Sequence, residues 1–214
     1  MTTAVRVLLV DDHAVVREGY RRLLERASDI QVAGEAASAA EAYQAFCKLA
    51  PAVVVMDLSL PDASGIEATR RLLARDAGAR VLAFSIHDEA IYAERAFLAG
   101  AAGYVTKASA PDVLVDAVRK VARGESFLSP DIAQTIALAR LSNREPDLAC
   151  LSAREFEIVR LLAQGHTVRA IADTLCLSTK TVSNHQSAIR RKLGAESPVE
   201  LIRIAAQSGL VRET

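Results

Sequence analysis

Five short apolar segments, each followed by an amphipathic stretch, fill residues 5–123 of this 214-residue chain and constrain its fold most. The segments are Val5–Val10, Ile30–Gly34, Ala52–Met56, Arg80–Ser85 and Gly103–Thr106. They are rich in β-branched residues, and most lack alternation with polar residues, which is typical of strands buried on both faces. The intervening stretches repeat apolar residues at helical spacing. We predict an α/β fold with five parallel strands in the order 2-1-3-4-5, covered by helices.

The pattern changes after Gly124, which predicts three parts: an α/β domain over 1–124, a linker with a helix over 125–147, and an all-α domain over 148–214. The expected linker helix lies around Asp131–Leu141. Four helices are expected in the last part, at Ala153–Gln164, Val168–Leu175, Thr179–Leu193 and Pro198–Gln207. This part is also the basic one, with 9 basic and 6 acidic side chains.

Composition excludes several classes of protein. The 26 basic and 26 acidic side chains balance, so an attraction to nucleic acid has to be local. The 3 cysteines are scattered, which argues against a disulfide framework or a zinc site. The apolar Val5–Val10 run ends at two aspartates and is too short for a secretion signal. No apolar run approaches the length of a membrane span, so we expect a cytoplasmic protein without membrane contact.

Polar side chains follow four of the predicted strands. Asp11 and Asp12 follow the first, Asp57 the third, Ser85 ends the fourth and Lys107 follows the fifth. The carboxyl ends of parallel strands share one edge, where ligands bind. Three carboxylates gathered there need a cation, and oxygen ligands without His or Cys favour Mg²⁺. With a lysine and a hydroxyl beside them, the carboxylates form a site suited to accepting a phosphoryl group.

Three of these residues also have a structural interpretation. Asp12 is a plausible helix cap, Asp57 a plausible turn cap, and Lys107 an ordinary surface lysine. Their joint occurrence at strand ends favours the functional interpretation.

Residues 5–123 resemble the receiver domain of two-component response regulators. The matching motifs are Leu9-Val10-Asp11-Asp12-His13, Val55-Met56-Asp57-Leu58, Leu60-Pro61-Asp62 with Gly65, Ala83-Phe84-Ser85, and Gly100 to Tyr104 with Lys107. The resemblance implies that Asp57 is the phosphoacceptor and that Mg²⁺ is held by Asp11, Asp12, Asp57 and the Ser59 carbonyl. It further implies that Ser85 is the switch hydroxyl, Tyr104 the switch aromatic that enters from outside, and Lys107 the phosphoryl contact. Ser59 and His87 flank the site at positions that modulate dephosphorylation in the family.

Residues 168–193 predict a helix, a tight turn and a second helix. The second helix has an apolar stripe formed by Val182, His185, Ile189 and Leu193. Because His185 lies on this stripe, we interpret it as a packing residue. The candidate DNA contacts on that helix are Lys180, Thr181, Ser183, Asn184, Ser187, Arg190, Arg191 and Lys192. Short polar side chains that reach base edges, beside cations for phosphate, are typical of a recognition helix. A solvated cationic helix is the structural alternative.

Residues 148–210 resemble the four-helix LuxR-type DNA-binding domain of the NarL/FixJ class of response regulators. The matching signature comprises Leu151-Ser152 with Arg154-Glu155, Leu162-Ala163 with Gly165, Ile171-Ala172, Leu177-Ser178, Thr181-Val182, His185, and Ile189 with Lys192-Leu193. The segment His166–Arg169 departs from the usual pattern, so the contacts of that helix entry with the DNA backbone stay open. The last helix resembles the dimerisation helix of the class.

The sequence therefore predicts a transcription regulator, not an enzyme, that is phosphorylated at Asp57, dimerises and binds double-stranded promoter DNA. Its expected partners are a sensor histidine kinase, a second copy of the chain and RNA polymerase. A Mg²⁺-dependent phosphatase is the enzyme alternative, but that class needs an aspartate where Ser59 stands. A regulator gated without phosphorylation is the other alternative, and the intact acidic pocket speaks against it.

Overall fold

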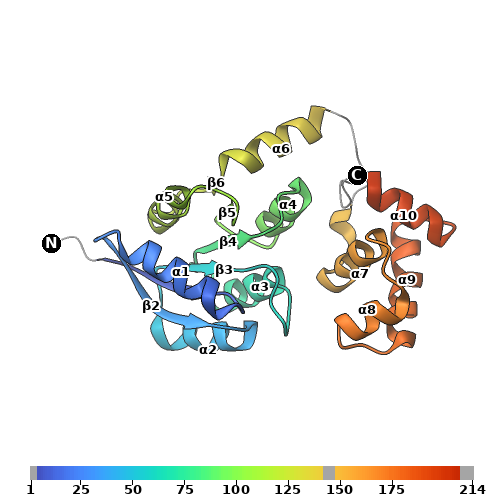
Figure 1. Ribbon diagram of the computed structural model, residues 1–214, viewed down its shortest axis with the longest axis horizontal. Coiled ribbons are helices and arrows are strands. Elements are labelled where there is room, and N and C mark those ends of the chain that lie inside the picture. The colour runs from blue at the N-terminus through green and yellow to red at the C-terminus, as the bar shows by residue number, and fades with distance from the viewer. Residues whose placement is uncertain (1–3, 142–147, 208–214) are drawn as a thin grey trace. The chain divides into compact units, whose positions relative to one another are not determined.

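The computed structural model describes residues 4–141 and 148–207 of the chain. It separates into two compact units, Met1–Ile136 and Ala137–Thr214 (Figure 1). Among the described residues, no helix combines the length and the apolar character needed to cross a bilayer.

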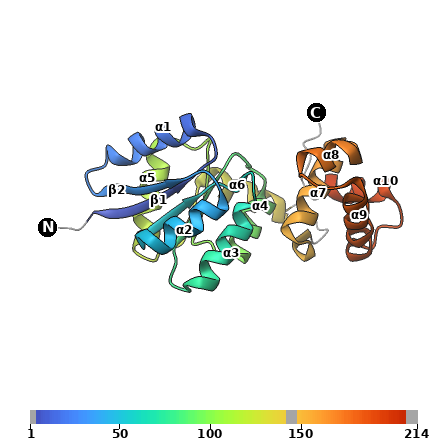
Figure 2. The same cartoon turned by 90° about the horizontal axis from the view of Figure 1, so that it is seen from below.

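The first unit is a parallel sheet in the order β2-β1-β3-β4-β5-β6, with helices on both faces (Figure 2). The strands are β1 (Val5–Val10), β2 (Ile30–Ala36), β3 (Val53–Met56), β4 (Val81–Ser85), β5 (Gly103–Thr106) and β6 (Phe127–Leu128). The helices are α1 (Ala14–Glu25), α2 (Ala39–Leu49), α3 (Gly65–Arg75), α4 (Ala90–Leu98), α5 (Pro111–Ala122) and α6 (Pro130–Leu141), the last of which runs past the unit boundary. The α/β class and the order of the first five strands are as predicted.

The prediction of five strands is wrong, because β6 adds a sixth at the β5 edge. Gly103 pairs with Phe127, and Tyr104 pairs with Leu128. Two residues are too few to show a periodicity, and the preceding Gly-Glu-Ser and the following Ser-Pro are typical of loops. The pairing depends on contact with β5, which the local sequence does not encode. As a result, the start of the segment expected to be a linker belongs to the sheet.

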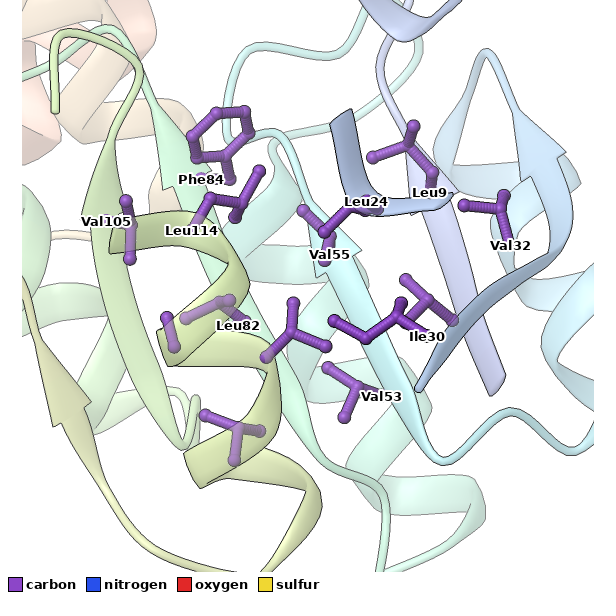
Figure 3. Close-up of a cluster of buried hydrophobic side chains, with 14 residues drawn as sticks. Leu9, Leu24, Ile30, Val32, Val53, Val55, Leu82, Phe84, Val105 and Leu114 are labelled. Carbon is purple, nitrogen blue, oxygen red and sulfur yellow. The ribbon is translucent and has the colours of Figure 1, made fainter. Parts of the chain in front are cut away.

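Two apolar clusters hold the sheet between its helices. The first packs α1 and α5 on one face, through residues such as Leu24 and Leu114, which lie over Val55 and Leu82 (Figure 3). The second packs α2 and α3 on the other face, through Phe46 and Leu72. Because central strands are buried on both sides, β3 and β4 are apolar throughout until their carboxyl ends. The polar residues are thereby confined to one edge.

The second unit contains a 3-10 turn at Leu148–Cys150 and four helices, α7 (Ala153–Ala163), α8 (Val168–Thr174), α9 (Thr179–Leu193) and α10 (Pro198–Gln207). All four expected helices are present. Ser152 caps α7 in a capping box with Glu155, Thr167 caps α8 and Ser178 caps α9. Buried side chains of all four helices, including Phe156, form its core.

Candidate functional site

The predicted polar residues meet at the carboxyl edge of the sheet. Asp11 and Asp57 are buried at the ends of β1 and β3, and Ser85 is fully buried at the end of β4. The sheet holds them in line, since the Asp57 amide donates to Val10 O at 2.9 Å and the Lys107 amide donates to Ser85 O at 2.7 Å. Neighbouring strands therefore present these side chains to one pocket.

Lys107 joins the two buried carboxylates. Its Nζ donates to Asp11 Oδ2 at 2.6 Å and to Asp57 Oδ2 at 2.7 Å. Burial raises the pKa of the Asp57 carboxyl, and the hydrogen bond from Lys107 acts against that rise. Burial opposes the charged form of Lys107, but its bonds to Asp11 and Asp57 hold the pKa of the ammonium above its ordinary value. The pocket thus places a fixed positive charge against the carboxylate that the sequence assigns as acceptor.

The residues beside Asp11 and Asp57 are suited to hold a cation. Ligand atoms of Asp11, Asp12 and His13 lie within 4.8 Å of one another. Asp12 does not cap α1, because His13 occupies the cap position and its amide donates to Asp11 Oδ1 at 2.8 Å. The His13 ring contacts Asp12 Oδ1 at 2.7 Å through Nδ1, a neighbour that the sequence analysis did not include. The carboxylate oxygens suit a hard divalent ion.

The loop after β3 packs closely against Gly65, the first residue of α3. A Cβ on Gly65 would lie 2.0 Å from Asp57 O and 2.7 Å from Leu58 Cα, so only glycine permits α3 to start this close to the site. The Ser59 amide donates to Asp57 Oδ1 at 3.1 Å, and this bond orients the carboxylate. Asp57 therefore does take part in a turn, as well as facing the pocket.

Tyr104 and His87 are linked to Ser85 by hydrogen bonds. Tyr104 is fully buried in β5, and its hydroxyl donates to His87 O at 2.8 Å. Burial raises the pKa of the Tyr104 phenol well above its ordinary value. The His87 amide donates to Ser85 Oγ at 3.2 Å, its ring stacks on Tyr92 at 3.9 Å, and its Nε2 lies 3.4 Å from Ser59 Oγ. The Tyr104 ring is thus already inside, and His87 connects it to the pocket rim.

In the second unit, α9 carries the candidate DNA contacts. Val182 and Ile189 are buried, whereas the exposed members of the candidate set are Lys180, Ser183, Asn184, Ser187, Arg191 and Lys192. Thr181 and Arg190 are half-buried, and the Thr181 hydroxyl lies 2.8 Å from the capping Ser178 Oγ. The helix therefore has an inner apolar face and an outer face of cations and short polar side chains.

Four of the predicted contacts have intramolecular partners, namely Thr181, Ser183, Ser187 and Lys192. Ser183 Oγ donates to Thr179 O at 3.0 Å, and Lys192 Nζ lies 2.6 Å from Glu155 Oε2. Glu155 also accepts from the Ser152 amide at 2.8 Å, so one carboxylate joins the cap of α7 to α9. Spacing along the sequence cannot show this pair, because the two residues are far apart in the chain.

A parallel sheet with an acidic pocket and a lysine at its carboxyl edge, followed by a helix-turn-helix unit with a polar outer face, defines a receiver joined to a DNA-binding domain. Residues 7–119 match the response regulator receiver domain, and residues 149–205 match the luxR family of bacterial regulatory proteins. The chain belongs to these families and is a two-component response regulator of the NarL/FixJ class, a DNA-binding transcription regulator and not an enzyme.

Individual relatives with similar sequences match most of the length of this chain. The response regulator GacA of Pseudomonas aeruginosa is 38% identical over 209 residues, covering 97% of this chain and 98% of its own. UvrY of Escherichia coli is also 38% identical, covering 96% and 95%. A LuxR-family response regulator from Aurantimonas is 50% identical with a TM-score of 0.63, covering 65% of this chain and 99% of its own. RcsB from Salmonella enterica, solved bound to a promoter with the phosphomimetic BeF3⁻, is 25% identical with a TM-score of 0.66, covering 95% and 99%.

Proposed function

We propose that Asp57 accepts a phosphoryl group from a sensor histidine kinase, and that the phosphorylated chain dimerises and binds promoter DNA. The observation that carries this proposal is the contact of Lys107 Nζ with both Asp11 and Asp57. A buried carboxylate held against a fixed cation is poised to attack and to carry added negative charge. The functional domains are proposed to run over 1–124 and 148–214, joined by 125–147, of which Phe127–Leu128 pairs with β5.

The chemistry is an in-line transfer. An oxygen of Asp57 attacks phosphorus, a P–O bond forms as the P–N bond of the donor phosphohistidine breaks, and the electron pair leaves with the imidazole. Lys107 pairs with a phosphoryl oxygen, and the Ser85 hydroxyl, fully buried beside the pocket, donates to another. Asp11, Asp12, Asp57 and the Ser59 carbonyl would hold Mg²⁺, which when bound neutralises charge on the transferring group.

A change at the phosphoacceptor site is transmitted to the neighbouring loop through His87. Ser85 Oγ accepts from the His87 amide, and His87 O accepts from Tyr104, so a shift of Ser85 toward a phosphoryl group disturbs both bonds. Phosphoryl contacts supply the free-energy difference between the two states. Two copies with α9 in successive major grooves would read half-sites about one helical turn apart. RNA polymerase is a further proposed partner, and the cytoplasm, where the promoters lie, is the proposed location.

Acetyl phosphate with Mg²⁺ tests the acceptor. We expect one acid-labile phosphoryl group per chain at Asp57, measured by mass spectrometry of the intact chain and its peptides. Asp57→Asn abolishes it, because an amide is not a comparable nucleophile. Asp76→Asn, which changes an exposed aspartate outside the pocket, leaves it unchanged. Asp12→Ala loses labelling that a high Mg²⁺ concentration partly restores. Full labelling of the Asp57→Asn chain would refute the assignment.

A further inference from the structure

Asp131, in the first turn of α6, is hydrogen-bonded to the last residue of β5 and to the segment that follows it. Thr106 Oγ1 donates to Asp131 Oδ2, and Ser109 Oγ donates to Asp131 Oδ1 at 3.2 Å. The two hydroxyl oxygens lie 2.9 Å apart. Burial acts to raise the pKa of the Asp131 carboxyl, but hydrogen bonds from neighbouring hydroxyls, Thr106 among them, hold it below its ordinary value. A charged carboxylate thus fastens α6 to β5.

This cluster lies one residue from the phosphoacceptor pocket. Thr106 is the last residue of β5, is buried, and immediately precedes Lys107. The same strand carries Tyr104, whose carbonyl accepts from the Ser129 amide at 3.0 Å. Ile132, the next residue of α6, is fully buried. The chain around the start of α6 is therefore hydrogen-bonded to β5 at two residues, Tyr104 and Thr106. Lys107 directly follows this strand.

A simpler account is that Asp131 only stabilises the N-terminal end of its own helix, as acidic residues in a first turn do. That account explains the charge of Asp131. It does not explain why both carboxylate oxygens accept from hydroxyls on another element, or why a buried strand residue is a threonine. Asp131 also lies beyond residues 7–119, the extent of the receiver match.

We propose that Asp131 is a positioning residue for phosphoryl acceptance, which acts through Thr106 to hold Lys107 and which couples the state of Asp57 to helix α6. Lys107 changes partners when Asp57 carries a phosphoryl group, so the backbone of Thr106 and its bond to Asp131 respond. The coupling is reciprocal: loosening α6 from Thr106 disturbs Lys107, and phosphorylation alters the stability of α6. Because α6 leads along the chain toward the DNA-binding unit, it is the segment through which the signal leaves the receiver. This inference rests on the proposed phosphorylation of Asp57.

The test uses full-length chains with Thr106→Val, Asp131→Asn and Ser109→Ala, and with Thr135→Val as the matched control. Thr135 lies on the same helix, and its hydroxyl donates to Asp131 O within α6, so its loss leaves the cluster intact. Two quantities are measured on each chain: the rate of phosphorylation by acetyl phosphate, and the hydrogen exchange of peptides covering Pro130–Leu141 with and without BeF3⁻. Circular dichroism confirms folding, and Ser109→Ala, the mildest change, keeps the test valid if another variant unfolds.

We expect Thr106→Val and Asp131→Asn to slow phosphorylation at least about fivefold, the lower end of typical coupling between sites. In the same chains, BeF3⁻ should no longer change the exchange of α6, as it does in the wild type and in Thr135→Val. Wild-type rates together with an unaltered α6 response in both variants would overturn the proposal. If the wild-type chain itself took up no phosphoryl group, the proposed function would fail instead, so the two failures are distinguishable.

Discussion

Lys192 Nζ lies 2.6 Å from Oε2 of Glu155, so the last turn of α9 is tied to the first turn of α7. Glu155 is almost fully buried, and the same carboxylate closes the capping box of α7. The ion pair gives Lys192 an intramolecular partner, whereas the exposed Arg191 beside it has no ion pair among residues 4–141 and 148–207. We therefore expect the two neighbours to contribute to DNA binding in different ways.

A salt titration of DNA binding separates the two roles. Arg191→Ala should weaken binding to all duplexes and lower the salt slope by about one, because it removes a phosphate contact. Lys192→Ala should weaken binding through loss of the Glu155 contact, with the slope nearly unchanged. A drop of one unit for Lys192→Ala would instead show that this lysine contacts phosphate directly, as its place in the sequence suggests.

The Glu155 carboxyl makes the second unit sensitive to acid. Burial acts to raise the pKa of this carboxyl, but Lys192 and the Ser152 amide hold it below its ordinary value. The stabilisation is therefore complete above the ordinary glutamate pKa of about 4.3 and is lost as the pH falls through the lowered value. Glu155→Gln keeps a capping side chain and removes the charge. Its α7 peptides should exchange faster than the wild type at pH 7, and the difference should disappear in acid. An equal difference at both pH values would contradict this.

Gly65 leaves no room for a side chain beneath Asp57. Gly65→Ala should displace the loop after β3, because the added carbon meets backbone atoms of Asp57 and Leu58. A displacement near 1 Å lowers the rate of a well-oriented reaction by roughly 100-fold. The rate of phosphorylation by acetyl phosphate should therefore fall steeply. Gly19→Ala is the control, since nothing lies within 4 Å of the added carbon on α1. Normal phosphorylation of the Gly65→Ala chain would show that the loop adapts.

The Tyr104 hydroxyl holds the loop that contains His87. Tyr104→Phe removes this hydrogen bond, worth about 1 kcal/mol in net stability, and should speed hydrogen exchange in residues 86–89. Phosphorylation of Asp57 should continue, because the variant keeps both buried carboxylates and their contacts with Lys107. Tyr43→Phe, at an exposed tyrosine on α2, serves as the control. Unchanged exchange in the loop would separate Tyr104 from the switch.

The outer face of α9 should determine sequence preference. Asn184→Ala and Ser183→Ala should each cost about 1–3 kcal/mol on the specific duplex and little on a scrambled one, if each reads a base edge. Binding of both duplexes measured at several salt concentrations gives this difference. Full discrimination by both variants would move the readout to another part of the domain.

Much of the fold could be predicted from local sequence. Buried parallel strands such as Val53–Met56 are apolar on both faces, and the helices between them have one apolar side, so element type and order follow from periodicity. The carboxyl ends of parallel strands share an edge, which is why the sequence alone predicts that Asp11, Asp57 and Lys107 lie together. The helix-turn-helix unit follows from the apolar stripe of Val182 and Ile189.

Tertiary structure decided what depends on partners distant in the chain. The strand Phe127–Leu128 exists because β5 offers an unpaired edge, and two residues carry no pattern of their own. The inward position of Tyr104, the bonds of Asp131 to Thr106 and Ser109, and the pair of Lys192 with Glu155 each join residues separated by 17 to 37 positions. Sequence periodicity reports which face of an element is buried, because burial is a property of each residue. It cannot report which polar group meets which, because that depends on how the elements pack in three dimensions.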